Sequence, residues 1–213
     1  MKSFSSILLR STIALAMCGG GFTARAETDL TAVVREYKAE GMEFQQLTFR
    51  DNKERIEYEL PSGWTFSGSS NQLRIKPPQK SFAEAVVQFV PLSKPQPLDE
   101  SARSALKEKV IAELPAGSQF AKIEQETESP ILLGGQPTFE LLVSYQLIGE
   151  TFHRSILVAN RSDNQWSFRF TAKKADFEPL RNEFRRSLLS WQWLAASDKF
   201  PQNATAAVTG SAH

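Results

Sequence analysis

The chain has 213 residues, with 25 Lys and Arg against 24 Asp and Glu, two histidines and one cysteine. That length accommodates one domain with appendages, and the near-neutral charge gives no electrostatic basis for binding nucleic acid or an anionic membrane surface. A single cysteine excludes an intramolecular disulfide and a zinc site built from several thiolates.

The first 26 residues have the pattern of a signal peptide. Lys2 and Arg10 supply positive charge, residues 13–22 form a short apolar stretch, and Ala24-Arg25-Ala26 places small residues around a cleavage site. The stretch is too short to span a bilayer, which takes about 20 residues. We therefore expect export to the periplasm or the extracellular space. The alternative is a lipoprotein anchored through Cys18, although the preceding methionine departs from the usual small residue.

Cleavage after Ala26 would leave a mature chain without cysteine, with 22 basic residues against 24 acidic ones. Such a chain has no thiolate nucleophile, and an ordinary hydrophobic core must stabilise it. No transmembrane span is expected in it.

The first element expected after the leader is a short helix within residues 27–43. Its apolar side chains recur at the spacing of a helix face: Leu30, Val33, Val34 and Tyr37. Thr28 or Asp29 can cap its start, and Gly41 can end it.

From residue 44 onward, apolar residues alternate with polar ones, which is the period of β-strands. Turn residues separate these strands at 51–53, 61–63, 68–71 and 77–78. A helix is then expected from about residue 100 to 114, capped by Asp99 or Ser101, with one apolar face.

Four further strands are expected at about 119–127, 138–147, 151–159 and 165–171. Asp176 then caps a final helix, whose apolar stripe is Phe177, Leu180, Phe184, Leu188 and Trp191. Residues 195–213 are rich in small polar residues and are predicted to be a disordered tail. Residues 44–194 therefore predict a single α+β domain, in which helices flank a mainly antiparallel β-sheet.

Three short motifs stand in a recognisable order. They are Tyr58-Glu-Leu-Pro61-Ser-Gly63-Trp64, then Gly134-Gly135-Gln136-Pro137 before a long strand pair, then Phe177-Glu-Pro-Leu180 through Ser187-Leu188. Together they resemble the PsbP/Mog1/DcrB-like family over about residues 44–193. The resemblance implies an α/β/α sandwich, with helices on both sides of the sheet. That family includes photosystem II accessory proteins, a nuclear GTPase-binding factor and bacterial envelope proteins, so it implies a non-catalytic accessory or binding domain.

Side chains suited to catalysis are sparse. His153 and His213 are the only histidines, and His153 follows the strand pattern of a packed or solvated residue. Ser104-Ala-Leu-Lys107 and Ser162-Asp163-Asn164 match two motifs of penicillin-recognising serine enzymes, but the accompanying Lys-Thr-Gly is absent. No catalytic residue is predicted. A hydrolase would need His153 or an acidic pair in a cleft.

Alternating carboxylates were weighed as ligands for a metal ion. Glu124, Glu126 and Glu128 are expected to share one strand face, as are Glu57 and Glu59. Without a calcium-binding loop, we interpret them as a solvent face that discourages edge pairing. Neither a metal nor a cofactor is predicted.

Trp193, Arg181 and Arg185 are the candidate binding residues. The arginines lie near one side of the final helix, and Trp193 follows its stripe, where it is either exposed to a partner or packed in the core. The favoured function is an exported accessory domain that binds another protein through the sheet face or the last helix. The alternative is a carrier of a small apolar ligand or lipid. The partner, the ligand and the oligomeric state stay open.

Overall fold

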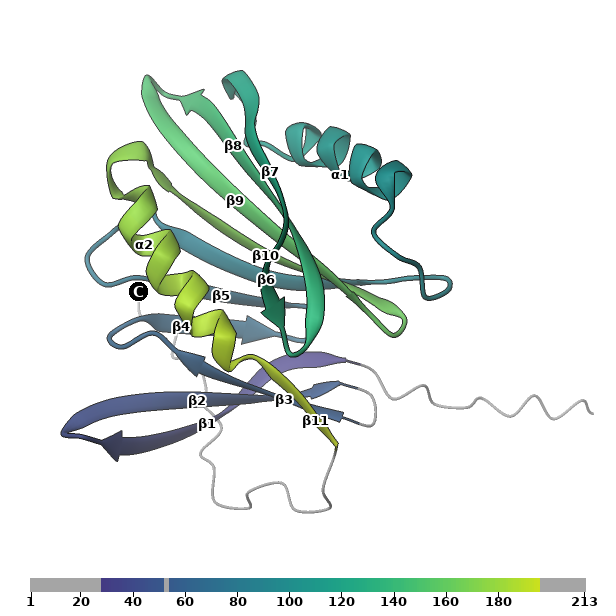
Figure 1. Ribbon diagram of the computed structural model, residues 1–213. Helices are drawn as coiled ribbons and strands as arrows, with labels where there is room; N and C mark the ends of the chain where they lie inside the picture. Colours follow the sequence, from purple (N-terminus) through teal and green to yellow (C-terminus); the bar gives the residue numbers. More distant parts are fainter. Residues whose placement is uncertain (1–27, 52–53, 196–213) are drawn as a thin grey trace, which may run out of the picture.

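The computed structural model describes residues 28–51 and 54–195, and it folds them into two antiparallel sheets and two α-helices (Figure 1). The expected signal peptide, with Cys18, and residues 196–213 of the expected tail lie outside the described residues. Ala195, expected to begin the tail, instead ends a strand.

Within the described residues, the larger sheet has seven strands and the smaller has four. The order of the larger sheet is β4 (Thr65–Ser69), β5 (Gln72–Lys76), β6 (Glu84–Pro91), β10 (Asn164–Lys173), β9 (Glu150–Arg161), β8 (Gln136–Leu147) and β7 (Gln119–Leu133). The order of the smaller sheet is β1 (Asp29–Ala39), β2 (Met42–Asp51), β3 (Glu54–Leu60) and β11 (Gln192–Ala195). The helices are α1 (Glu100–Ala112) and α2 (Lys174–Ser187), and a 3₁₀ turn at Leu188–Ser190 follows α2.

The seven-stranded sheet is the middle layer of the molecule (Figure 1). One face is covered by α2 and the four-stranded sheet, and all three contribute aromatic residues to the main core. The other face carries α1, whose Leu106 and Val110 pack on β8 and β9. This confirms the predicted α+β class with helices on both sides of an antiparallel sheet. The second sheet was not predicted.

The helix predicted within residues 27–43 is wrong, because Asp29–Ala39 forms strand β1 and pairs with β2. In this strand Leu30, Ala32 and Val34 contribute to the core at every second position. The apolar residues therefore fit the period of a strand as well as that of a helix, and spacing alone could not separate the two.

The final helix is shorter than its apolar stripe predicted. Helix α2 runs from Lys174 to Ser187, and Asp176 lies in its first turn rather than capping it. After the 3₁₀ turn the chain extends, so Trp193 lies in β11, which pairs with β3. The turn keeps Trp191 in the core, so the stripe continues although the helix does not.

The helix expected near residues 100–114 is confirmed as α1. The Asp99 carboxylate accepts a hydrogen bond from the Ala102 backbone N–H at 2.9 Å, which satisfies one of the free donors of the first turn. Leu98 packs against the cluster beneath the helix, as expected for a residue just before the cap.

The acidic residues of β7 do not share one face, contrary to the sequence prediction. The register with β8 shifts between residues 123 and 125, and such a bulge turns the following side chains over. The partners are Ser144 of β8 for Glu124, and Lys107 and Arg103 of α1 for Glu126 and Glu128. Two of the three carboxylates therefore attach α1 to the edge strand.

A buried polar cluster joins the start of the chain to β10. The Thr28 hydroxyl donates to the Asp51 carboxylate at 2.7 Å, and the Asn164 side-chain amide donates to the Thr28 oxygen at 3.2 Å. Burial raises the pKa of Asp51 above its ordinary value of 3.8, while the Thr28 hydrogen bond and the Arg161 charge oppose the rise.

This raised pKa predicts a pH dependence for the Asp51→Asn variant. Because the folded state holds the Asp51 proton more tightly than the unfolded state, the wild type loses stability as pH rises from about 3.8 through the folded pKa. Asparagine cannot ionise and escapes this loss. The melting temperature of the variant minus that of the wild type should increase between pH 3.5 and pH 7, measured by circular dichroism. A difference that decreases over this range would contradict the assignment.

Candidate functional site

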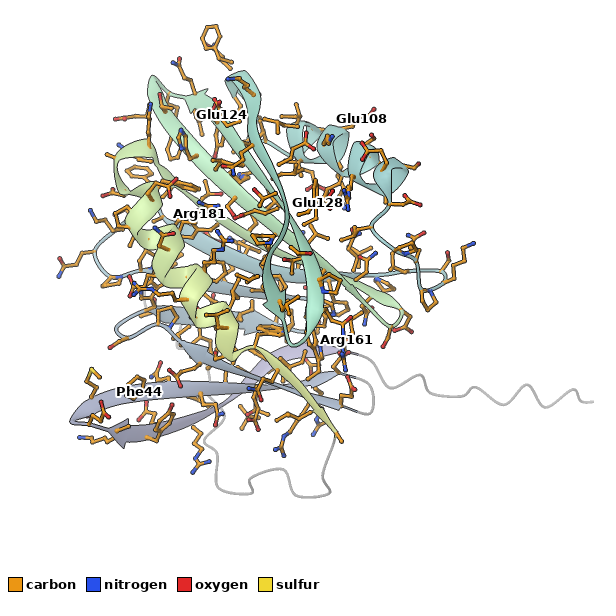
Figure 2. The ribbon with its side chains drawn as sticks, in the orientation of Figure 1. Phe44, Glu108, Glu124, Glu128, Arg161 and Arg181 are labelled. Atoms are coloured by element: carbon orange, nitrogen blue, oxygen red, sulfur yellow. The ribbon has the colours of Figure 1, made fainter. Side chains whose placement is uncertain are left out.

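Arg181, labelled in Figure 2, and Arg185 lie on α2 and both contact one buried carboxylate, Glu140 of β8. The Arg181 Nη2 and Nε atoms lie 2.9 and 3.2 Å from Glu140 Oε1, and the Ser155 hydroxyl donates to the same oxygen at 2.6 Å. Arg185 Nη1 lies 3.7 Å from the other carboxylate oxygen. The Arg181 side chain is only 13% exposed. These arginines anchor α2 to the sheet, and Glu140 supplies a counter-charge to both.

Trp193 is half-buried between the two sheets. Its ring makes edge contacts with Trp166 and Trp191 at centroid distances of 5.9 and 6.0 Å. The Arg161 guanidinium lies 4.8 Å from the ring centroid and binds both oxygens of Glu54. The indole therefore helps to join the smaller sheet to the larger one.

Gly134, in the turn between β7 and β8, lies directly against the Trp193 ring. A Cβ atom at this position would be 2.4 Å from the ring, and the backbone has a φ of +50°. Both facts require glycine here. The Gly134-Gly135 motif is thus partly explained by its packing against a tryptophan from the other sheet.

The three predicted binding residues do not form one surface. The arginines lie beneath α2 on the carboxylate of Glu140, whereas Trp193 lies on β11. Their role in binding a partner stays a prediction.

A different surface is left open on the α1 side of the seven-stranded sheet. Along β10, Trp166, Phe168 and Phe170 are buried in the main core, and the residues between them point the other way. Helix α1 covers β8 and β9, whereas β4, β5, β6 and β10 leave half-buried and exposed side chains beside it. We call this region the open sheet face. It includes Arg74, Gln88, Val90, Gln165, Ser167 and Arg169.

A pocket lies where the open sheet face meets α1. It encloses about 490 Å³ of empty space, its open mouth included. Its charged lining residues are Arg154, Arg169, Lys109 and Glu113. Its uncharged polar lining comes from Gln88, Gln165 and Ser167, and the remaining lining residues are aliphatic. The sheet and the α1 segment therefore both contribute polar and aliphatic residues to the lining.

Arg154 is the most buried charged group of this pocket, with 7% of its surface exposed. Its Nε donates to the Thr171 hydroxyl at 3.0 Å, and its Nη1 donates to the Glu113 backbone carbonyl at 3.3 Å. Burial lowers the pKa of Arg154, and the nearby Arg169 charge adds to this effect. Within residues 28–51 and 54–195, neither arginine forms an ion pair with a carboxylate.

The amino-acid sequence does not predict this pocket. Arg154 and Arg169 stand alone at polar positions of two strands, which is typical of a solvent-facing residue. Only the register brings them together, since Arg154 pairs with Thr171 and Arg169 with Ile156. The alternation of polar and apolar residues along β9 and β10 predicts that each arginine lies on a sheet face, but it does not reveal which strands pair.

His153 packs edge-on against the Phe177 ring of α2, at a centroid distance of 5.3 Å. Burial lowers its pKa, and the Lys174 charge contributes. Among the described residues there is no group of three His, Cys, Asp or Glu side chains that could hold a metal ion. No helix in the same residues has the length and apolar character needed to cross a membrane.

Comparison with known proteins identifies the fold. No family model matches the chain, and no curated protein matches it. The structure is similar to cyanobacterial PsbP (CyanoP) from Synechocystis sp. PCC 6803, with a TM-score of 0.51 and 14% sequence identity, over 84% of this chain and 98% of that chain. PA94, a protein of unknown function from Pseudomonas aeruginosa, matches 73% of this chain and 93% of its own length, with 14% identity and a TM-score of 0.45. The likeness to CyanoP confirms the PsbP-like fold that the three motifs predicted.

The contact between Gly134 and Trp193 predicts non-additive effects in a double-mutant cycle. Gly134→Ala should destabilise the protein, because its methyl group collides with the ring and its φ is strained. Trp193→Ala removes the ring and should itself cost about 3 kcal/mol. The loss in free energy of unfolding caused by Gly134→Ala should be at least 1 kcal/mol smaller in the Trp193→Ala background than in the wild type, measured by urea unfolding. Additive costs would show that the two positions do not interact.

The buried carboxylate of β8 predicts a large effect of the Glu140→Gln variant. Glutamine leaves the Arg181 charge buried without its counter-charge, so the free energy of unfolding should fall by about 3 kcal/mol. Glu178→Gln is the matched control, since its exposed side chain also contacts Arg181, at 3.4 Å. That control should change the stability by less than about 0.5 kcal/mol. Equal effects in the two variants would contradict the anchoring role.

Proposed function

We propose that this protein is an exported accessory protein without catalytic activity, and that it binds another protein through the open sheet face. The observation that carries the proposal is the uneven cover of the seven-stranded sheet. One face is closed by α2 and a second sheet, whereas α1 closes only part of the other. A flat face with mixed polar, aliphatic and arginine side chains has the composition of protein interfaces that form and dissociate.

The open sheet face is better suited to a partner than the elements named from the sequence. Arg181 of the last helix is neutralised by Glu140 and mostly buried. On the open sheet face, by contrast, Arg169 has no carboxylate partner among the described residues, and Val90 is 44% exposed. An exposed valine and a guanidinium without a carboxylate partner in the described residues lie on the same sheet face, and together they offer apolar area and directional hydrogen bonds.

Aromatic side chains weigh against the alternative of an apolar-ligand carrier. A carrier would hold its ligand between the sheet and the layer above it. In that space the ring centroids of Trp166 and Trp191 are 5.7 Å apart, and those of Phe168 and Trp191 are 5.0 Å apart. All three rings are fully buried. These rings occupy the volume that a ligand would need.

Export is proposed from the N-terminal pattern of charge, apolar stretch and small residues, with the periplasm or the extracellular space as the destination. Anchoring through Cys18 is the alternative form of the same proposal. A PsbP-like fold is compatible with an accessory role.

Site-specific photo-crosslinking in the host tests this proposal. A benzophenone amino acid replaces Val90 on the open sheet face, or Leu189 as the matched control. Both positions are exposed and apolar, but Leu189 lies in the 3₁₀ turn on the other side of the sheet. We expect irradiation to give a covalent adduct with one partner protein from position 90, and none from position 189. An adduct only from position 189, or from neither position, would overturn the proposal.

A further inference from the structure

We infer that the pocket formed by Arg154 and Arg169 binds a carboxylate group of the partner protein. This inference rests on the proposed function, since the pocket opens onto the open sheet face. The ligand is a carboxylate supplied either by an acidic side chain or by a C-terminus.

The first argument is the unusual state of Arg154. Taking a guanidinium out of water is costly unless an opposite charge compensates it. The other mostly buried arginines obey this rule: Arg181 binds Glu140, Arg161 binds Glu54, and Arg103 binds Glu128. Arg154 is at least as buried, yet its partners among the described residues are the Thr171 hydroxyl, the Glu113 backbone carbonyl and the Tyr145 ring, and none of these is a carboxylate. A bound carboxylate would supply the missing counter-charge.

The second argument is the charge of the pocket as a whole. Arg154, Arg169 and Lys109 bring three positive charges to its lining, and Glu113 brings one negative charge. Lys109 already faces the Glu113 carboxylate at 3.8 Å, so within residues 28–51 and 54–195 the two arginines have no carboxylate partner of their own. Their mutual repulsion contributes to the lowered pKa of Arg154. An anion between them relieves both the repulsion and the cost of burial.

The third argument is the register of β9 and β10. Arg154 lies opposite Thr171, and Arg169 lies opposite Ile156, so the two arginines are diagonal neighbours on one face. Diagonal neighbours are separated by about 7–8 Å, which long side chains can bridge toward a shared anion. The planar guanidinium matches the two oxygens of a carboxylate. Ser167 and Gln165 lie next along β10 and can donate further hydrogen bonds.

Carboxylate fits this site better than phosphate. Aliphatic residues such as Val90 and Val158 line the same pocket and can contact the methylene groups that carry a carboxylate.

The test is a titration of the full chain, in which the arginine Nε–H signals of Arg154 and Arg169 are followed by NMR at constant ionic strength. The probes are acetyl-Ala-Glu-Ala-amide, acetyl-Ala-Gln-Ala-amide, acetyl-Ala-Ala-Ala with a free carboxylate, and inorganic phosphate. We expect saturable shifts with at least one of the two carboxylate peptides and none with the glutamine peptide. Binding of the glutamate peptide indicates a side-chain carboxylate, and binding of the peptide with the free carboxylate indicates a C-terminal one. No saturation with either, or tighter binding of phosphate, would overturn the inference.

Three variants extend the test. Arg169→Gln should weaken binding of the carboxylate peptide about tenfold, since one charge-assisted hydrogen-bond donor is lost. Glu113→Gln should strengthen binding, because it removes the one carboxylate that the described part of the chain places in the lining. Arg186→Gln is the matched control, with the same loss of charge on α2, and should bind as the wild type does. Unchanged affinity in Arg169→Gln, with an unchanged melting temperature, would contradict the inference.

Failure of this inference can be told apart from failure of the proposed function. An adduct from position 90 without a carboxylate-induced shift would refute the carboxylate site and support the protein-binding surface. Carboxylate binding without any adduct from position 90 would keep the anion site and refute binding of a partner on the open sheet face.

Discussion

The Trp191 indole lies where both sheets and the C-terminal segment meet, and the arrangement of the layers depends on it. Its ring is fully buried and packs against Phe168 of the larger sheet and Tyr58 of the smaller sheet, at centroid distances of 5.0 and 5.5 Å. A buried aromatic ring removes a large apolar area from water and fixes the geometry of its neighbours. Because this residue follows α2 and precedes β11, the same contact sets where the helix ends and where the last strand begins.

The sequence predicted those elements whose apolar period is unambiguous. The strands from β2 to β10 alternate strictly enough for their existence and order to be predicted, and the Asp99 cap located α1. The errors fall where one pattern fits two structures. Leu30 and Val34 satisfy both a helix and an edge strand. The stripe ending at Trp191 continues through a 3₁₀ turn that spacing cannot distinguish from a helix.

The candidate site was harder to predict, because it is made by strand register. Arg181 and Arg185 were named from their shared helix face, but a helix face does not reveal that Glu140 lies beneath it. Arg154 and Arg169 were not named, since their proximity follows from the pairing of β9 with β10. The bulge in β7 had a similar effect, as it divided three alternating glutamates between two faces. Long-range pairing is the information that local patterns lack.

The position of β11 has a consequence for how the chain is made. Strand β3 pairs on one side with β2, its neighbour in sequence, and on the other side with residues 192–195 near the end of the described chain. A ribosome releases the first three strands long before β11 and Trp191 emerge, so during synthesis β3 has a free edge and no aromatic ring to cover it. Closure of the smaller sheet is therefore a late event that waits for residues 192–195, and a nascent chain without them would expose the β3 edge to chaperones.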